Sequence, residues 1–518
     1  MTGKTEPWPA DRETTQAALV LFNDAAEVQV DGRHHVLLRS LRHLEDPGLR
    51  PLFVGLSEAE HPSLRVHGRL GRAELAEPRG LSLADIAEVA RDDERHELIA
   101  AALDGGLIPD EIRSALLGWS GLDAGVKLLL VTPRVAAGEF GTDSPGYVDV
   151  AAALNDAALG RQGLAALLLH ELGDAQGTAV LRELAEIESA EAEAVRAVLL
   201  ETAWMQGLRG AGPWAAAVAE RPGVSPTVEM LARRVAIRFG AEGAESGWAE
   251  AFAGAEEVSR RTRLALTGLE VSPWMASERF DALVSSEDEL IAALGRAGRA
   301  VARGRADGAA AYNGEGGHDA VLAALIDRQH ARVSRWAADF AAETRSAALA
   351  AAVVERTRPG EPRGRARRMD AVARATATLV ELNEAIASRG VSTALAERSG
   401  DDDAAWRRAV LLGLLRSEPA AARGAVTNLP TFDDRPTAAI ALLLRARVGE
   451  ADWTTRQLDA LSLAVRGGAG LDDSLRIVAA WTYLKHTGQG AGAIAAVLAP
   501  APPLGEESTP APGPGKRP

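Results

Sequence analysis

The sequence predicts an all-α protein made largely of a solenoid of stacked helical hairpins, and three observations support this fold class. Apolar residues recur at a spacing of about 3.6, which is typical of amphipathic helices and not of strands. Alanine and leucine supply most of the apolar residues, and both favour helix. Short breaks containing proline, glycine or aspartate separate the apolar runs, as expected where one helix ends and the next begins.

The organisation along the chain follows from where these runs and breaks fall. At 518 residues the chain is larger than a typical single-core domain, so it either splits into domains or grows as an array. The predicted segments are a polar N-terminal arm at 1–13, an N-terminal hairpin array at 14–241, a central region of longer helices at 242–390, a C-terminal array at 391–498 and a disordered proline-rich tail at 499–518.

Three stretches with a less regular pattern are also interpreted as helical. Residues 126–131 are the best strand candidate, but they are rich in leucine where a strand prefers β-branched residues, so we expect a buried helix. Residues 318–356 have the pattern of one long helix or of two closely joined helices. Residues 369–388 have the pattern of another long amphipathic helix.

Repeated segments favour an array over separate globular domains. Each repeat opens with an acidic turn that can cap a helix N-terminus, and an alanine- and leucine-rich helix follows. The four clearest segments are 155–174, 402–415, 433–444 and 472–481. The last three begin roughly 30 to 40 residues apart, which is the length of a helical hairpin. Because one hairpin cannot bury its apolar face alone, we expect neighbouring hairpins to share one continuous core.

The repeats resemble those of the HEAT-repeat superfamily, in which an acidic or Asp-Pro turn precedes the second helix, an arginine lies early in it and a Leu-Gly-Asp-like turn ends it. The matching residues are Arg161, Leu172, Gly173 and Asp174, the segment 64–71 after Glu60-His61-Pro62, and the arginines Arg407 and Arg476. The third segment departs from the pattern, because Thr437 and Ala438 stand where the arginine is expected. The resemblance covers 34–190 and 398–498. It implies a right-handed α-solenoid and carries no catalytic residues with it.

The charge and composition of the chain indicate which binding partners and which cellular compartment to expect. The net charge is −15 with a pI near 5.3, and an acidic surface repels nucleic acid and anionic membranes at long range. The absence of cysteine excludes disulfides and thiolate metal sites. The N-terminus lacks the apolar core of a signal peptide, and no apolar stretch is long enough for a membrane span. We therefore expect a cytoplasmic protein without membrane insertion, an expectation that a start codon further upstream would change.

The familiar catalytic, cofactor and metal motifs do not occur, so the sequence predicts no catalytic, cofactor-binding or metal-ligating residue. His170-Glu171 has no second histidine at the zinc-protease spacing, and His34 and His35 are adjacent and point about 100° apart on a helix. No phosphate-binding loop of the Gly-x-x-x-x-Gly-Lys-Ser/Thr type is present. The stretch 118–121 (Gly-Trp-Ser-Gly) is one residue short of a nucleophile elbow, so Ser120 is interpreted as a turn residue.

Two clusters of arginine are the main departure from the acidic composition. They supply the candidate site residues Arg296, Arg299, Arg303, Arg305, Arg363, Arg365, Arg367 and Arg368. Guanidinium groups bind phosphates and carboxylates, so the clusters indicate a patch for an anion, a nucleic acid or an acidic partner. The alternative is that they are solvated linker residues that balance neighbouring Glu and Asp.

The expected function is that of a non-catalytic scaffold that binds another protein on the curved surface of the array. Tryptophans Trp406 and Trp481 lie in repeat helices, where core anchoring is expected, and other tryptophans are candidates for a binding face. An alternative is a nucleic-acid-binding repeat protein, similar to alkylation-repair DNA glycosylases, that uses the central arginine clusters. A chaperone-like bilin lyase is a third class that related repeats serve, and no residue of this chain singles it out.

Overall fold

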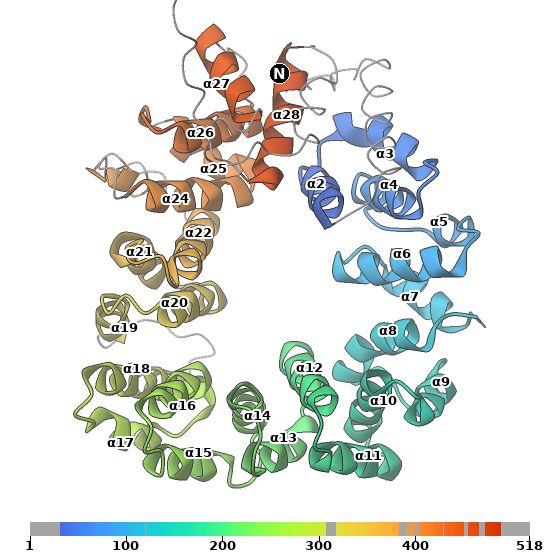
Figure 1. The fold of residues 1–518 in the computed structure, drawn as a ribbon, viewed down its shortest axis with the longest axis vertical. Helices are drawn as coiled ribbons and strands as arrows, with labels where there is room; N and C mark the ends of the chain where they lie inside the picture. Colours follow the sequence, from blue (N-terminus) through green and yellow to red (C-terminus); the bar gives the residue numbers. More distant parts are fainter. Residues whose placement is uncertain are drawn as a thin grey trace, which may run out of the picture. The chain divides into compact units, whose positions relative to one another are not determined.

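The computed structural model confirms the all-α fold class. It describes residues 32–119, 121–306, 318–382, 391, 393–395, 397, 398, 403–427, 429–449, 454–465 and 472–487. All regular structure within these ranges is helical, with several short 3-10 turns, and none of these residues is in a β-strand (Figure 1). The predicted arm at 1–13 and tail at 499–518 lie outside the described residues.

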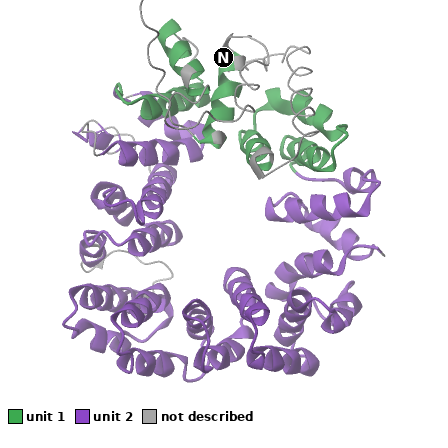
Figure 2. Cartoon of the chain, viewed as in Figure 1, with its two compact units in different colours: residues 1–79, 431–518 green, residues 80–430 purple. Residues whose placement is uncertain are grey.

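The chain divides into two compact units, of which the first is built from both ends of the sequence (Figure 2). Unit 1 comprises residues 1–79 and 431–518, and unit 2 comprises residues 80–430. The two units are divided by the density of contacts within each of them, whereas the five segments expected from the sequence are divided by the type of helix and repeat. Those five segments therefore remain a prediction.

In unit 1, helices from the two chain ends pack together. Its described helices are α2 (Gly32–Arg42), η1 (Pro47–Leu49), α3 (Arg50–Ser57), α4 (Pro62–Glu74), α26 (Arg435–Arg447), α27 (Thr455–Val465) and α28 (Asp473–Thr487). Helix α2 packs on both α4 and α28. Asp46 reinforces this contact, because its carboxylate accepts hydrogen bonds from Trp481 Nε1 at 3.1 Å and from Lys485 Nζ at 2.6 Å.

Unit 2 contains the longer run of helices. Its first half comprises α5 (Leu83–Ala87), α6 (Asp92–Asp104), α7 (Asp110–Leu117), α8 (Ala124–Ala136), α9 (Tyr147–Ala152), η2 (Ala153–Asn155), α10 (Leu159–Glu171), α11 (Ala175–Glu186), α12 (Ala190–Gln206), α13 (Ala211–Glu220) and α14 (Pro226–Arg238). Its second half comprises α15 (Ala244–Ala253), α16 (Val258–Val271), η3 (Ser272–Trp274), η4 (Ser277–Phe280), α17 (Asp281–Val284), α18 (Glu289–Ala306), α19 (His318–Ile326), α20 (Ala331–Thr344), α21 (Ala347–Arg356), α22 (Arg365–Leu382), α24 (Ala404–Arg416) and α25 (Pro419–Thr427).

Helices of unit 2 pack in pairs that are neighbours in sequence, and every second helix also packs on its counterpart in the next pair. The pairs include α10 with α11, α13 with α14, and α20 with α21. Across pairs, α8, α10, α12, α14 and α16 form one row, and α20, α22 and α24 form another (Figure 1). The predicted buried helix at 126–131 is confirmed, because this segment lies in α8 and most of its residues are buried.

Small residues allow the closest helix contacts. A Cβ atom added at Gly177 of α11 would lie 2.7 Å from Leu169 Cβ of α10. A Cβ atom added at Gly413 of α24 would lie 2.3 Å from the carbonyl oxygen of Ala373 in α22. Interiors are packed too densely to absorb such overlaps without movement. These glycines therefore set the separation between helices.

A recurring arginine joins a helix to the end of the helix before it. Each such side chain donates to a carbonyl oxygen that follows or ends the preceding helix, where helical carbonyls lack partners. The pairs are Arg65 with Ala59, Arg95 with Val89, Arg196 with Leu184, Arg368 with Pro359, Arg407 with Arg398, and Arg476 with Val465. In α4, α6, α22, α24 and α28 this arginine is the fourth helical residue. We call these six side chains the arginine clamps.

The expected single or double helix at 318–356 is wrong, because this stretch forms three helices, α19, α20 and α21. Gln329 and Arg345, at the two breaks, adopt left-handed conformations with φ of 56° and 54°. Non-glycine residues rarely do so, and no glycine or proline marks either break in the sequence. The expected helix at 369–388 begins earlier, as α22 starts at Arg365, and residues 383–390 lie outside the described part.

Candidate functional site

Two tryptophans and two arginines gather where α12, α14 and η3 meet. Arg234 and Arg238, one turn apart on α14, place Cζ at 4.4 and 4.5 Å from the ring centroid of Trp204 at the end of α12. Trp274 of η3 meets Trp204 edge to face, with ring centroids 5.6 Å apart, and Arg238 lies 5.3 Å from the Trp274 centroid. We call Trp204, Arg234, Arg238 and Trp274 the tryptophan–arginine cluster. All four side chains are only partly buried.

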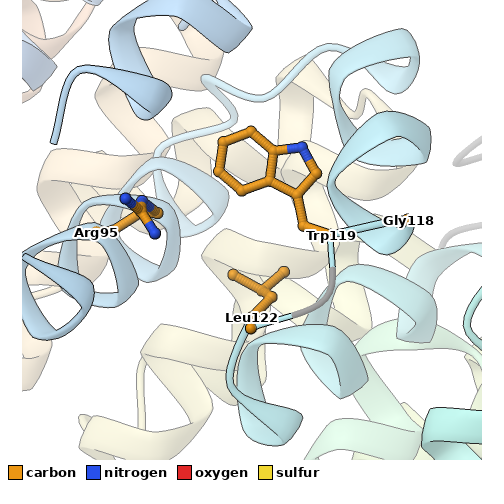
Figure 3. A pocket seen from close by; sticks show the side chains of 5 residues that line it. Arg95, Gly118, Trp119 and Leu122 are labelled. Atoms are coloured by element: carbon orange, nitrogen blue, oxygen red, sulfur yellow. The ribbon is translucent and has the colours of Figure 1, made fainter. Parts of the chain in front are cut away.

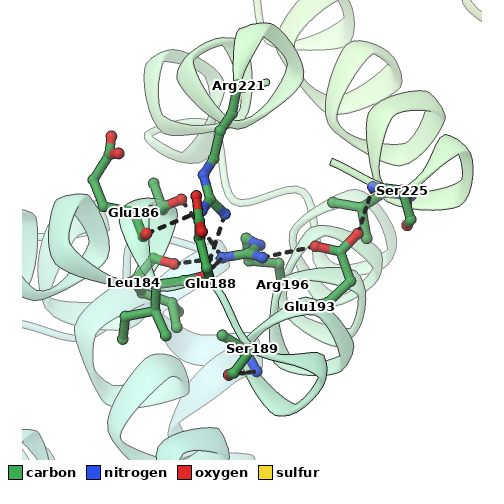
Figure 4. A network of polar contacts seen from close by, with 12 residues as sticks. Leu184, Glu186, Glu188, Ser189, Glu193, Arg196, Arg221 and Ser225 are labelled. Carbon is green, nitrogen blue, oxygen red and sulfur yellow. Dashed lines mark hydrogen bonds and ion pairs between the residues drawn. The ribbon is translucent and has the colours of Figure 1, made fainter. Parts of the chain in front are cut away.

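The polar network around Arg196 fixes the helices that carry this cluster (Figure 4). Arg196 of α12 donates to the carbonyl oxygens of Leu184 and Ile187, at 2.8 and 2.9 Å, and pairs with Glu193 at 2.7 Å. The other carboxylate oxygen of Glu193 accepts from the backbone N–H of Ser225 at 2.8 Å. Ser225 in turn caps α14 by accepting from Val228 N–H. One buried arginine thus sets α12 relative to the start of α14.

Within the cluster, Arg238 stays positively charged, and little nearby negative charge balances it. Arg238 Nη1 donates to the carbonyl oxygen of Trp204 at 2.5 Å, near the helix end where a cation is favoured. Burial lowers the pKa of the Arg238 guanidinium, Glu343 opposes this effect and Arg234 adds to it. The ordinary pKa of an arginine lies so far above neutral pH that the guanidinium stays charged. A half-buried cation stacked on two indoles is thus available to a ligand.

Helix α12 also carries exposed apolar side chains, on a face about 100° around the helix from Trp204. Met205 is 72% exposed and Val198 is 62% exposed. They are seven residues apart, close to two helical turns, so they share one face of α12. Tryptophan, arginine and methionine are enriched at protein interfaces, and tryptophan and arginine supply many of the residues that dominate binding energy. The arrangement suits contact with another protein better than turnover of a small molecule.

A shallow pocket of about 380 Å³ lies between the end of α7 and α6 (Figure 3). Arg95, Gly118, Trp119, Gly121 and Leu122 line it, and Arg95 Cζ lies 5.6 Å from the Trp119 ring centroid. The terminal nitrogens of Arg95 already donate to Val89 O at 2.7 Å and to Asp92 at 2.8 Å. The one charged group among its described lining residues, Arg95, therefore serves as an arginine clamp. Ser120, interpreted from the sequence as a turn residue, lies outside the described residues.

Two histidines that the sequence separates come together in unit 1. His35 Nδ1 lies 2.9 Å from His67 Nε2, and Arg42 Nη1 lies 3.4 Å from His67 Nδ1. Arg42 also forms a buried two-point ion pair with Glu74, at 3.0 and 2.8 Å. Burial, followed by the charge of Arg42, lowers the pKa of His67 to about 3, so His67 is neutral at physiological pH. Within the described residues, no three His, Asp or Glu side chains are grouped as a metal site.

The structure separates the arginines that the sequence singled out. Arg368 is buried and is one of the clamps, and Arg365 donates to the carbonyl oxygen of Gly360 at 2.9 Å. Arg299 pairs with Asp281 at 3.2 Å. The exposed members are Arg296 and Arg303 on α18 and Arg363, Arg365 and Arg367 at or near the start of α22, while the Arg305 side chain lies outside the described part. Arg365 and Arg368 therefore hold the loop before α22 in place.

Sequence reasoning missed the tryptophan–arginine cluster. Its members come from three separate segments, and the only local signal is the four-residue spacing of Arg234 and Arg238, which places both on one helix face. Trp204 and Trp274 carry no mark that distinguishes them from core tryptophans. Trp406, by contrast, is fully buried and Trp481 nearly so, as expected.

Comparisons with known proteins identify no relative. No protein-family model, no curated protein and no solved structure matches the chain. The resemblance to HEAT repeats thus remains a prediction. None of the described helices is both long enough and apolar enough to cross a membrane.

Proposed function

We propose that this chain is a non-catalytic scaffold, a right-handed solenoid of HEAT-like hairpins that binds another protein through the tryptophan–arginine cluster. The observation that carries the proposal is the stack of Arg234 and Arg238 on Trp204, which is only partly buried and lies on a helix that also exposes Met205. Such groups have large contact areas and lose little conformational freedom on binding, which is why they dominate many interfaces.

The arginine clamps support the part of the proposal that describes an array of stacked hairpins. They occur in both units, from Arg65 to Arg476, with the same kind of acceptor and, in most cases, the same helical position. A repeated structural bond is what repeated hairpins require, because each hairpin must hold its neighbour in the same geometry. A rigid array in turn presents a preorganised surface, which lowers the cost of ordering on binding.

The strongly shifted titratable groups support the non-catalytic half. His67 lies in the Arg42–Glu74 network, and Asp370 and Asp46 accept from arginine or lysine side chains. Burial and then the charge of Arg42 lower the pKa of His67, and contacts with basic side chains hold the pKa of Asp46 and of Asp370 below the ordinary value against the opposing effect of burial. Ion-pair networks perturb pKa values without catalysis.

Co-purification from the native host tests the scaffold proposal with a matched pair of variants. Met205→Glu adds a charge beside the cluster, and Val148→Glu adds the same charge at a similarly exposed apolar residue on α9. We expect wild type and Val148→Glu to retain the same near-stoichiometric protein, and Met205→Glu to lose it. Equal retention by both variants, or no stoichiometric partner for wild type, would reject the proposal.

The nucleic-acid alternative rests on the exposed arginines. Arg296 and Arg303 are seven residues apart and share a face of α18. The net charge of −15 opposes approach to a polyanion. A gel shift with duplex DNA at low salt tests it: a complex that weakens steeply with salt and with Arg296→Glu/Arg303→Glu supports it, and no shift removes it.

A further inference from the structure

A line of ion pairs connects the helices of unit 2 from α14 to α24. Glu270 of α16 pairs with Arg234 of α14 at 3.2 Å and with Arg332 of α20 at 2.7 Å. Three residues further along α20, Arg335 pairs with Asp370 of α22, which also accepts from Arg416 of α24 at 3.3 Å.

These links show that the side chains share one surface. Arg332 and Arg335 are three residues apart on α20 and lie on one face of that helix. On α22, Arg374 joins the same network through Asp370 at 3.1 Å and through Asp339 of α20 at 3.6 Å. The tryptophan–arginine cluster lies at the α14 end of the line. We call its arginines the basic stripe: Arg234, Arg238, Arg332, Arg335, Arg374 and Arg416.

Positive charge exceeds negative charge along the stripe. Its six arginines interact with four carboxylates of the described residues, Glu270, Asp339, Glu343 and Asp370, and these ten groups carry an excess of two positive charges in a chain of net charge −15. Asp370 is shared by three arginines and Glu270 by two. One carboxylate compensates one guanidinium, so further carboxylates would be attracted to this surface.

The stripe is also open to solvent toward α24. The Arg374 and Arg416 side chains are 45% and 56% exposed. Arg374 and Arg416 donate to different oxygens of Asp370, and Arg374 also pairs with Asp339. Each guanidinium has five N–H donors, more than these contacts use, so each can also donate to an incoming carboxylate.

We propose that the basic stripe binds an acidic segment of the partner protein, with its carboxylates on Arg374 and Arg416 and an apolar side chain beside Trp204. This inference rests on the proposed scaffold function and names the chemistry of the partner. A peptide fits better than a nucleic acid because the net negative charge of the chain repels a polyanion more than a short acidic peptide.

Fluorescence anisotropy with defined probes tests the stripe. The probes are labelled peptides (Glu-Glu-Leu)4, (Gln-Gln-Leu)4 and (Lys-Lys-Leu)4, and a labelled 20-base-pair duplex. We expect the glutamate peptide alone to bind at low salt, and raising the salt to weaken it, because exposed charge pairs are screened. Binding of the glutamine peptide with equal affinity, or tighter binding of the duplex, would overturn the inference.

Two variants with the same change in net charge locate the binding. Arg374→Glu/Arg416→Glu reverses two exposed stripe residues, and Arg296→Glu/Arg303→Glu reverses two exposed arginines on α18. We expect the first to weaken the glutamate peptide by about tenfold or more and the second by no more than about twofold. Equal losses would contradict the assignment. Arg374→Gln/Arg416→Gln, a milder change, guards against misfolding and should lie between wild type and the charge reversal.

The same variants separate this inference from the proposed function. If the co-purified protein is lost with Met205→Glu but kept with Arg374→Glu/Arg416→Glu, the scaffold proposal stands and the acidic-segment inference fails. If both variants keep the protein, both proposals fail. Loss with both variants supports both.

Discussion

Arg238 lies over the indole ring of Trp204, with Cζ 4.5 Å from the ring centroid, and donates a hydrogen bond to the carbonyl oxygen of the same residue. This double contact ties the end of α12 to α14 and holds the tryptophan at the surface. Held in one orientation, the indole contacts a partner without first losing rotamer freedom.

Removal of the Arg196 side chain is expected to loosen α12 and α14 together. Arg196 is 2% exposed and satisfies two carbonyl oxygens and Glu193, all of which lose a charged donor in Arg196→Ala. A loss of about 2 to 4 kcal/mol in local stability follows from unpaired buried groups. Faster hydrogen exchange in both helices would show it. Arg182→Ala, at an exposed arginine of α11, is the control and should leave exchange unchanged.

Close contact between α22 and α24 predicts that Gly413→Ala destabilises unit 2. The new methyl group would lie 2.3 Å from the Ala373 carbonyl oxygen, so the helices must separate. Overpacking of this kind costs about 1 to 3 kcal/mol, which lowers the thermal unfolding midpoint. Gly141→Ala meets no atom within 4 Å and serves as the control. An unchanged midpoint for Gly413→Ala would contradict the packing described here.

Protonation of His67 predicts an acid-sensitive unit 1. Burial lowers the folded-state pKa of His67 to about 3, so the unfolded chain binds a proton that the folded one excludes. Stability is therefore fully present above pH of about 6.5 and falls as pH drops toward 3. The protection factors of α2 and α4 amides, which are exchange rates relative to the intrinsic rate at each pH, should fall over this window. His67→Gln should flatten the dependence, whereas His43→Gln, at an exposed position, should retain it.

Because Asp46 binds Lys485 and Trp481 of α28, we expect a change at Asp46 to weaken the contact between the two chain ends. Burial raises the pKa of Asp46, but hydrogen bonds from Lys485, Trp481 and Gly48 outweigh burial and hold this pKa below its ordinary value. Asp46→Asn removes the ion pair and should weaken the contact by about 1 to 2 kcal/mol. Limited proteolysis should then cut near α28 sooner. The wild-type contact should persist at neutral pH and weaken as pH falls through the lowered pKa of Asp46. Unchanged proteolysis of Asp46→Asn would count against this contact.

The helices could be predicted from sequence because periodicity and capping are local properties. Asp434 and Asp472 cap α26 and α28 where acidic turns predicted helix starts. The break at Gln329 could not be predicted, because a non-glycine residue takes the left-handed conformation there.

Contacts between distant segments explain why the site was missed. Glu270 and Arg332 are 62 residues apart in sequence, and their pairing follows from packing between α16 and α20. The sequence instead predicted a site at arginines that are close together in sequence. One of them, Arg368, is buried and donates to the carbonyl oxygen of Pro359. Local clustering of charge does not reveal which side chains share a surface.

A photo-crosslinking amino acid at Met205 tests the central claim most directly, with the same amino acid at Val148 of α9 as the control, because both side chains are well exposed. After irradiation in the native host, we expect one discrete crosslinked protein from position 205 and none from position 148. Equal crosslinking at the two positions, or none at position 205, would contradict a partner-binding surface at Trp204 and Arg238.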